Sequence, residues 1–169
     1  IYNPDGTEQP ASGKFYSLLT VTLFLLGLQR LGLVDKNPAT ISQVDWVKGA
    51  LLMIKTKIFE KLGGFDEKIF LYTEDMELCY RVHKLGLSCV FFPDIAIKHK
   101  EHGTGNRTSA IINIYANLPY FYKKHKSTFA YEYVKFLLRS KAIILLTAGK
   151  ILQNKYLEET YTKALKAIR

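Results

Sequence analysis

Residues 62–86 read LGGFDEKIFLYTEDMELCYRVHKLG, and this stretch holds five of the fifteen acidic residues of the chain. Gly63 and Gly64 permit a sharp backbone turn or the close approach of another molecule. Glu74 and Asp75 fall where a first helical turn is expected, and carboxylates there complement the positive end of the helix dipole. The stretch therefore predicts a glycine turn followed by a short helix that begins with a carboxylate cluster.

The extent of this helix follows from the spacing of its apolar residues and from its expected caps. Thr73 is a suitable N-cap and Gly86 a suitable C-cap. Apolar residues recur between them at helical spacing, at Met76, Cys79, Tyr80 and Leu85. Two interpretations of the acids remain open, a functional cluster and a purely structural one. The structural interpretation is that acids at a helix start often only complement the dipole, and that Glu77 and Arg81 are spaced as an ordinary surface pair. Spacing alone favours the structural interpretation.

The combination of motifs resembles the second half of inverting glycosyltransferases of family 2, particularly the bacterial rhamnosyltransferase-like branch. The motifs are VDWVKGA at 44–50, LGGFDE at 62–67 and FLYTEDMELCYR at 70–81, followed by L-G, P-D and a histidine. Together they are specific, whereas an E-D pair alone is a weak signal. The resemblance covers residues 2–125 and implies an α/β fold, the acceptor-side half of a GT-A domain, followed by a helical C-terminal tail.

The resemblance also implies roles for individual residues. Asp75 matches the aspartate that acts as general base and deprotonates the acceptor hydroxyl. The acceptor side is implied for Gly63, Gly64, Glu74, Arg81 and Trp46. Core packing is the more ordinary role for a sole tryptophan such as Trp46.

The donor side is implied for a second set of residues. Gly49 and Ala50 match small residues near the donor sugar. Arg107, with Thr104 and Asn106 beside it, is suited to phosphate oxygens. The nucleotide-sugar donor itself is expected to bind mainly to a β-α-β half that ends in a D-x-D motif, and no such half is found in this chain.

His99 is the metal candidate that the resemblance indicates. Related enzymes place a histidine here that joins the D-x-D aspartate on a divalent metal. Neutral imidazole suits manganese, while magnesium prefers oxygen ligands. The alternative is an ordinary surface histidine, and His102 is a weaker candidate. The metal, Mn or Mg, is expected to be held mostly by the D-x-D motif outside this chain.

The remaining N-terminal pattern predicts short elements. Strands are predicted at 44–54, 87–92 and 95–99, and a helix at 57–62. The apolar run at 15–28 has fourteen residues, fewer than the roughly 20 needed to span a bilayer. A buried or partner-facing helix is favoured there, and an interfacial membrane helix is the alternative because Lys14 and Arg30 flank the run.

The C-terminal part is predicted to be helical and basic. A helix from 108 is expected to be interrupted at Pro119, and further helices are expected at 128–152 and 157–168. Residues 121–169 hold eleven Lys and Arg and three Glu, so they carry nearly all of the net charge of +9. This predicts a division into residues 1–125 and a basic amphipathic tail at 126–169.

Three interpretations of this charge remain, namely a solvated face, nucleic acid, or an anionic membrane surface. No nucleic-acid motif is present, so no nucleic acid is expected. Peripheral contact with an anionic membrane fits best with an enzyme whose acceptor is a lipid-linked sugar. The two cysteines lie inside apolar patterns, which indicates reduced buried thiols. The expected place is therefore the cytoplasm, at the inner face of the cell membrane.

The function that the resemblance implies is transfer of a sugar, with inversion, from a nucleotide-sugar donor to an acceptor hydroxyl of a glycan or lipid-linked precursor. Because the nucleotide-binding half is not found, the chain by itself is expected to be inactive. The alternative is a non-catalytic basic module that binds anionic membrane or nucleic acid, for which Asp75 has no role.

Overall fold

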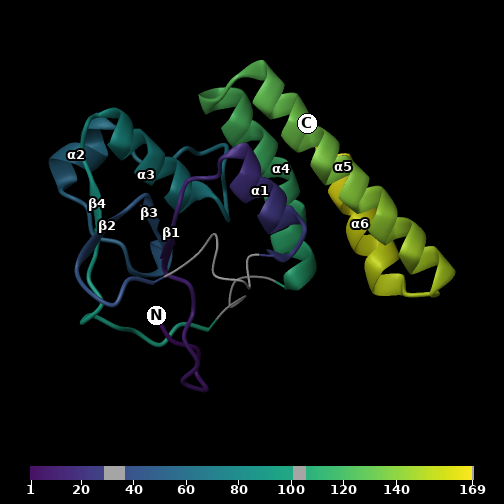
Figure 1. Ribbon diagram of the computed structural model, residues 1–169, viewed down its shortest axis with the longest axis horizontal. Helices are drawn as coiled ribbons and strands as arrows, with labels where there is room; N and C mark the ends of the chain where they lie inside the picture. The colour runs from purple at the N-terminus through teal and green to yellow at the C-terminus, as the bar shows by residue number, and fades with distance from the viewer. Residues whose placement is uncertain (29–36, 101–105, 169) are drawn as a thin grey trace. The chain divides into compact units, whose positions relative to one another are not determined.

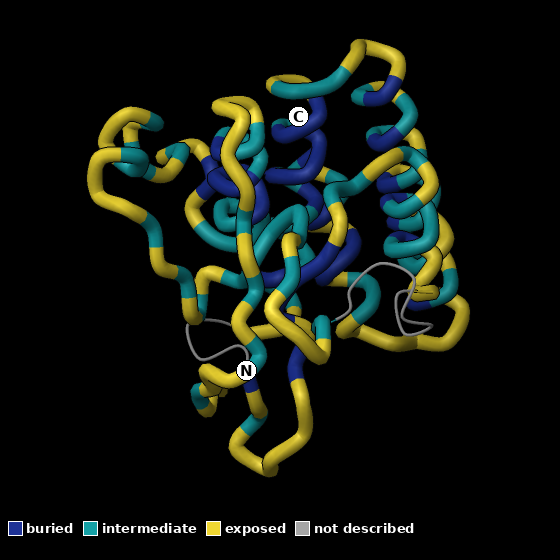
Figure 2. The backbone as a smooth tube through the Cα atoms, turned by 60° about the vertical axis from the view of Figure 1, so that its left-hand side comes forward, coloured by how far each residue is buried: buried dark blue, intermediate teal, exposed yellow. Residues whose placement is uncertain are grey.

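The computed structural model describes residues 1–28, 37–100 and 106–168, and it is a mixed α/β structure in which helices predominate (Figure 1). The chain forms two compact units. Unit 1 comprises Ile1–Phe70 and Glu74–Gly103, and unit 2 comprises Leu71–Thr73 and Thr104–Arg169. Buried residues gather mainly on the helices, whereas much of the connecting backbone is exposed (Figure 2).

Unit 1 is built from short elements around two small antiparallel sheets. Strand β1 (Ser12–Gly13) pairs with β3 (Trp46–Val47), and β2 (Ser42–Val44) pairs with β4 (Cys89–Phe91). The helical elements are α1 (Leu18–Leu25), the 3-10 turn η2 (Gly49–Leu51), α2 (Thr56–Lys61) and α3 (Glu74–Lys84). Helix α3 packs against β3 and β4.

The helix predicted over the central stretch is confirmed. It runs from Glu74 to Lys84, directly after Thr73, and its buried face consists of Met76, Glu77, Leu78, Cys79 and Val82. Gly86 follows it with a φ of 74°, as expected for a glycine beyond a helix end. The helix predicted at 57–62 is confirmed as α2, and the apolar run at 15–28 contains α1.

Two strand predictions are wrong. The predicted strand at 44–54 ends at Val47, after which the chain turns into η2. The amide of Gly49 donates to the side chain of Asp75 rather than to a neighbouring strand, so the extended conformation stops there. The predicted strand at 95–99 is reduced to a single bridge between Lys98 and Tyr2 within the described residues.

Unit 2 is a packed set of three helices, α4 (Arg107–His125), α5 (Thr128–Ile151) and α6 (Lys155–Ala167). Each helix follows an N-cap residue whose side-chain oxygen accepts the backbone N–H of the third helical residue. These N-cap residues are Asn106, Ser127 and Asn154. The three helices pack against one another. The fully buried residues between them include Leu118, Phe121, Tyr122, Val134 and Leu138.

The interruption predicted at Pro119 is wrong, because α4 continues through this residue. Pro119 is fully buried, with Leu118 and Phe121 beside it. A proline inside a helix costs about 3 kcal/mol. Burial of the surrounding side chains against the neighbouring helices offsets this cost. No helix in the described part of the chain is both long and apolar enough to cross a membrane.

The compact units divide at a different place from the predicted division at 125/126. The whole of α4 packs with α5 and α6, so unit 2 begins at Thr104. The segment Leu71–Thr73 also belongs to unit 2, although it continues directly into α3. The chain therefore passes from unit 2 to unit 1 at the residue before the carboxylate pair.

Candidate active site

The backbone that leads into α3 adopts an unusual conformation. Tyr72 and Thr73 have φ values of 66° and 82°, in the left-handed region that residues with a Cβ rarely occupy. The side-chain amide of Asn117 donates to the carbonyl oxygens of Leu71 and Tyr72, each at 2.8 Å. Asn117 is 7% exposed, so these bonds are shielded from water. Such strained segments persist where surrounding contacts fix them, and they cluster at functional sites.

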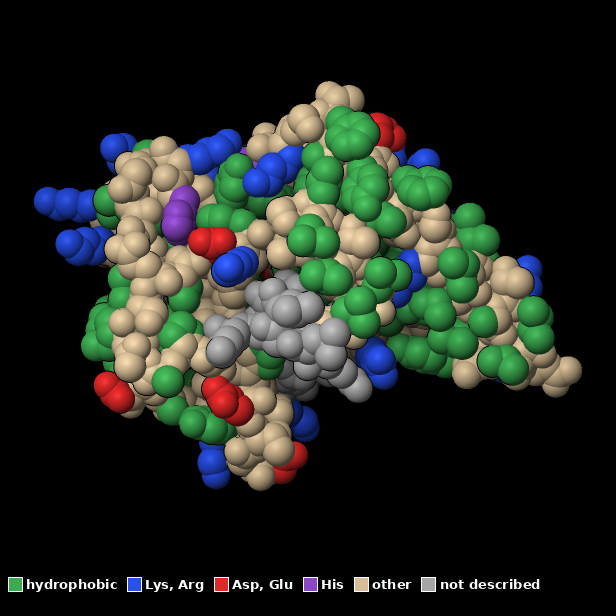
Figure 3. All heavy atoms as spheres, in the orientation of Figure 1, with side chains coloured by type: hydrophobic (Ala, Val, Ile, Leu, Met, Phe, Trp, Pro, Cys, Tyr) green, Lys and Arg blue, Asp and Glu red, His purple; other side chains and the backbone are tan. Residues whose placement is uncertain are grey.

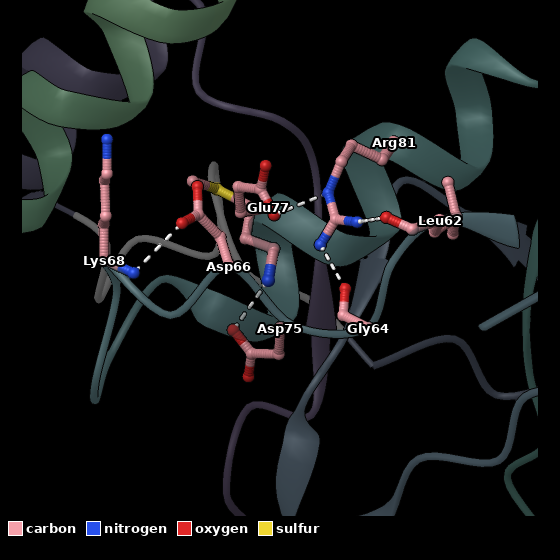
Figure 4. Close-up of polar contacts among 8 residues, drawn as sticks. Leu62, Gly64, Asp66, Lys68, Asp75, Glu77 and Arg81 are labelled. Atoms are coloured by element: carbon pink, nitrogen blue, oxygen red, sulfur yellow. Dashed lines mark hydrogen bonds and ion pairs between the residues drawn. The ribbon is translucent and has the colours of Figure 1, made fainter. Parts of the chain in front are cut away.

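Asp75 is held by two backbone amides, one of which is drawn as a dashed line to its carboxylate in Figure 4. Its Oδ2 accepts from the Gly49 N–H at 2.8 Å, and its Oδ1 accepts from the Met76 N–H at 2.7 Å. Burial raises the pKa of Asp75 above its ordinary value, and this outweighs the opposing effects of the two amides and of the Lys48 charge. The carboxylate therefore has a fixed orientation and an increased affinity for a proton.

Glu74 differs from its neighbour in having no fixed partner at one oxygen. Its Oε2 is buried and has no hydrogen-bond partner among the residues that the structure describes. Burial raises the pKa of Glu74 to about 7, and the adjacent Asp75 charge adds to the rise. Near neutral pH this carboxyl group exists in both protonation states, so it can donate or accept a hydrogen bond.

Arg81 and Glu77 form a buried pair rather than the ordinary surface pair that their spacing suggested. Glu77 is fully buried, and its Oε2 accepts from Arg81 Nε at 2.8 Å. The other guanidinium nitrogens of Arg81 donate to the carbonyl oxygens of Leu62 and Gly64, at 2.7 and 2.8 Å (Figure 4). Arg81 thus ties the end of α2 to α3.

The glycine pair forms the predicted turn. Gly63 and Gly64 both have a φ of 75°, a conformation that favours glycine. Arg81 fixes this turn through the Gly64 carbonyl. The structure therefore brings together three residues to which the resemblance gave acceptor roles, and those roles stay predictions.

Gln9 is a site residue that the sequence reasoning did not single out. It is 2% exposed and its side-chain amide contacts three residues. Its Nε2 donates to Asn3 Oδ1 and to the His99 carbonyl oxygen, both at 2.6 Å. Its Oε1 accepts from Lys48 Nζ at 2.9 Å and lies 3.2 Å from His99 Nδ1. The D-G-x-x-Q pattern at residues 5–9 was the available signal.

These contacts indicate which tautomer of the neutral His99 ring fits the network. The His99 carbonyl oxygen can only accept, so it fixes which end of the Gln9 amide carries the N–H groups. Gln9 Oε1 must then accept from His99 Nδ1, which carries the proton. In the neutral ring the lone pair is left on Nε2. Gln9 also connects His99 to Lys48, which directly precedes the Gly49 amide that binds Asp75.

The other predicted site residues in the described part of the chain lie on three different elements, β3, η2 and α4. Ala50 is in η2 beside Gly49. The indole N–H of Trp46 donates to the Lys14 carbonyl oxygen at 3.2 Å, and the ring is half-buried. Arg107 is the first residue of α4, in unit 2. His102 and Thr104 lie outside the described residues.

His99 is the residue of this network that was predicted to bind a divalent metal. Nε2 of His99 is the ring nitrogen that carries the lone pair, as a ligand must. Within the described residues no group of three or more His, Cys, Asp or Glu side chains could hold a metal ion. His99 could therefore contribute one ligand to a metal that other residues hold.

Comparison with known proteins supports the resemblance. The N-acetylglucosaminyl-diphospho-decaprenol L-rhamnosyltransferase of Mycobacterium tuberculosis is 28% identical to this chain over 144 residues. The match covers 78% of this chain and 43% of that protein. The rhamnosyltransferase WbbL of Escherichia coli is 27% identical over 82 residues, 48% of this chain and 31% of that protein. No family model and no solved structure matches the chain.

A third relative extends the comparison beyond rhamnosyltransferases. The low-salt glycan biosynthesis hexosyltransferase Agl10 of Haloferax volcanii is 33% identical over 57 residues, 32% of this chain and 19% of that protein. The chain is thus a relative of bacterial rhamnosyltransferases and of a hexosyltransferase, as its motifs predicted. It spans less than half the length of these relatives.

Proposed function

We propose that this chain is the acceptor-side part of an inverting glycosyltransferase of family 2 with a GT-A fold, and that Asp75 is its general base. The observation that carries the proposal is the Asp75 carboxylate itself. Two backbone amides orient it, burial raises its pKa, and a strained turn places it at the start of α3. A carboxylate with these properties can take a proton from a positioned hydroxyl group.

The proposed reaction balances with a single base. The acceptor oxygen forms a bond to the anomeric carbon while its proton moves to Asp75. The bond from that carbon to the donor phosphate breaks on the opposite face, which inverts the stereochemistry. One carboxylate suffices because a nucleoside diphosphate leaves without a proton, unlike the leaving group in glycoside hydrolysis. A bound divalent metal would neutralise charge on the diphosphate, and His99 Nε2 would be one of its ligands.

The other site residues have supporting roles in this proposal. Gly49 and Ala50 keep the backbone close to the donor sugar, and Arg107 meets a donor phosphate. Glu74 and Trp46 contact the acceptor, with Glu74 able to donate or accept a hydrogen bond near neutral pH. Gly63, Gly64 and Arg81 shape the acceptor approach. Residues outside this chain complete the donor site, so the chain alone would not transfer sugar.

The proposed acceptor is a lipid-linked glycan precursor. The mycobacterial relative is named for a sugar-diphospho-decaprenol acceptor. We place this protein at the inner face of the cell membrane, where such a precursor and a nucleotide sugar meet. Residues 104–169 hold twelve Lys and Arg and three Glu, which favours contact with anionic lipid. The same charge supports the alternative, a non-catalytic basic module.

A donor screen on the full-length protein tests the proposal. Radiolabelled nucleotide sugars, including a nucleoside diphosphate rhamnose, are incubated with a sugar-diphospho-polyprenol acceptor and Mn or Mg. We expect transfer from one donor class to the lipid fraction. The coupling constants of the new anomeric centre should show a configuration opposite to that of the donor. A product with retained configuration would contradict the proposal.

A further inference from the structure

Helix α5 exposes a row of large apolar side chains along its whole length. Phe129, Phe136, Ile144 and Ile151 are 72%, 65%, 65% and 74% exposed. With Ile143, also exposed, these residues form what we call the α5 stripe. Side chains of hydrophobic type follow α5 along the right-hand part of the molecule in Figure 3. Isolated exposed apolar residues are ordinary, but several large ones on one face of a helix mark an interaction surface.

The α5 stripe lies on the side of the helix that faces away from the other helices of unit 2. The buried residues of α5 are Ala130, Val134, Leu138, Ala142 and Gly149. At 3.6 residues per turn these positions share one face, and the members of the stripe fall on the opposite one. Helices α4 and α6 therefore cover the buried face and leave the stripe uncovered within unit 2.

The charges around the stripe are mostly positive. Arg139 and Lys150 are exposed and flank one edge, together with a single acid, Glu132. Lys123 and Lys124 precede the stripe at the end of α4, and Lys155 follows it. All of the net charge of +9 is accounted for by residues 104–169, since the rest of the chain has equal numbers of acidic and basic residues.

We propose that the α5 stripe lies in the headgroup region of an anionic lipid bilayer, with α5 parallel to the membrane plane. An apolar face flanked by Lys and Arg is the pattern of a helix that binds at such an interface. A second copy of the chain is a poorer occupant, because it would bring two strongly positive units together. Nucleic acid is also poorer, because the exposed centre of the stripe presents no cation to phosphates. This inference does not depend on the proposed reaction.

Vesicle flotation of the full-length protein tests it. The vesicles are phosphatidylcholine alone, or an equimolar mixture with phosphatidylglycerol. We expect binding to the anionic vesicles that weakens with added salt. The double variant Phe136→Glu, Ile143→Glu should lose about tenfold or more in binding, since two side chains no longer leave water. Phe92→Glu with Ile95→Glu, which places the same two charges on exposed apolar residues in unit 1, should bind as the parent does.

Three results would overturn the inference. In the first, the double variant of the stripe still binds anionic vesicles as the parent does. In the second, the parent binds both vesicle types equally. In the third, the parent binds no vesicles but self-associates with increasing concentration, and the double variant of the stripe does not. The last result, measured by sedimentation, would assign the stripe to a second copy. Circular dichroism checks that each variant is folded. A second double variant, Arg139→Gln with Lys150→Gln, removes two flanking charges without altering the stripe and should weaken binding to anionic vesicles. Sugar transfer is assayed separately with a detergent-dispersed acceptor, so either proposal can fail alone.

Discussion

The two compact units differ in how they are held together. Unit 2 is held by helix packing, with apolar residues such as Phe121 and Leu138 fully buried between helices. Unit 1 has strands of only two or three residues, and single polar side chains join its segments, as Arg81 and Gln9 do. Unit 1 is also electrically neutral, whereas unit 2 is strongly basic. In the proposed function, unit 1 therefore carries the general base, and unit 2 supplies a scaffold and a surface.

The largest stability effect should come from Arg81. Arg81→Leu removes the guanidinium that pairs with the fully buried carboxylate of Glu77, so we expect a loss of about 3–5 kcal/mol in the stability of unit 1. The sole tryptophan, Trp46, lies in unit 1 and reports its unfolding by urea through fluorescence, while far-UV circular dichroism follows the helices of unit 2. Arg139→Leu removes an exposed arginine from unit 2 and is the matched control, with an expected change below about 0.5 kcal/mol. Equal losses in the two variants would remove the distinction between the units.

In unit 2 the next largest loss of stability should come from disturbed helix packing at Gly149. A Cβ at Gly149 would lie 2.9 Å from Leu157 Cβ and 3.0 Å from the Glu158 nitrogen. Gly149→Ala should therefore destabilise unit 2 by about 1–3 kcal/mol, although alanine is favoured over glycine in a helix by about 1 kcal/mol. Thr147→Ala, at an exposed site of the same helix, should not destabilise. Thermal unfolding followed by far-UV circular dichroism measures both, and a stabilised Gly149→Ala would show that the helices pack less closely.

The pH dependence of stability should come largely from Glu74 in unit 1, with Asp75 contributing in the same direction because burial also raises its pKa. Its pKa rises from 4.5 to about 7 on folding, so the native state binds more protons than the unfolded state between these values. Stability should therefore fall as pH rises from about 4.5 to about 7 and level off above that. Glu74→Gln should flatten this part of the curve. Melting temperatures across the pH range provide the measurement, and an unchanged slope in Glu74→Gln would assign the effect to another group.

A smaller, local effect is expected at Gln9. Gln9→Leu removes the acceptor for His99 Nδ1–H, so the ring should shift toward a mixture of the two neutral tautomers. Gln9→Glu retains an acceptor oxygen and should preserve the Nδ1–H form. Nitrogen chemical shifts of the imidazole distinguish these states. If the parent protein already shows the Nε2–H tautomer, His99 does not present Nε2 as a ligand.

Helices could be predicted from the sequence more accurately than the site could. The pattern of residues 73–86 located α3, and the pattern from 128 to 152 located α5, because apolar periodicity and caps are local signals. The strands were located less accurately: the prediction at 87–92 contains β4, but the predictions at 44–54 and 95–99 were wrong, since pairing of two or three residues depends on distant segments. The Gln9 contact with His99 spans 90 positions, and no local pattern indicates it.

Within the site, the sequence indicated residue types but not their environments. Asp75 could be singled out from its motif, yet its bond to the Gly49 amide depends on the turn after β3. The spacing of Glu77 and Arg81 says nothing of their burial, which depends on what packs over α3. The left-handed Tyr72 and Thr73 had no signal at all, because neither residue is a glycine or asparagine.

The account depends most on Asp75 as the proton acceptor. The decisive measurement compares sugar transfer by the full-length protein and its Asp75→Asn variant, with donor binding measured by calorimetry on the same samples. Asparagine retains an oxygen for the Gly49 amide but loses the acceptor for the Met76 N–H, so circular dichroism of both proteins checks that the variant is folded. We predict a loss in transfer rate of roughly a hundredfold to ten-thousandfold with donor affinity unchanged. Transfer at the parent rate would contradict the assignment of Asp75 and, with it, of unit 1 as the catalytic part.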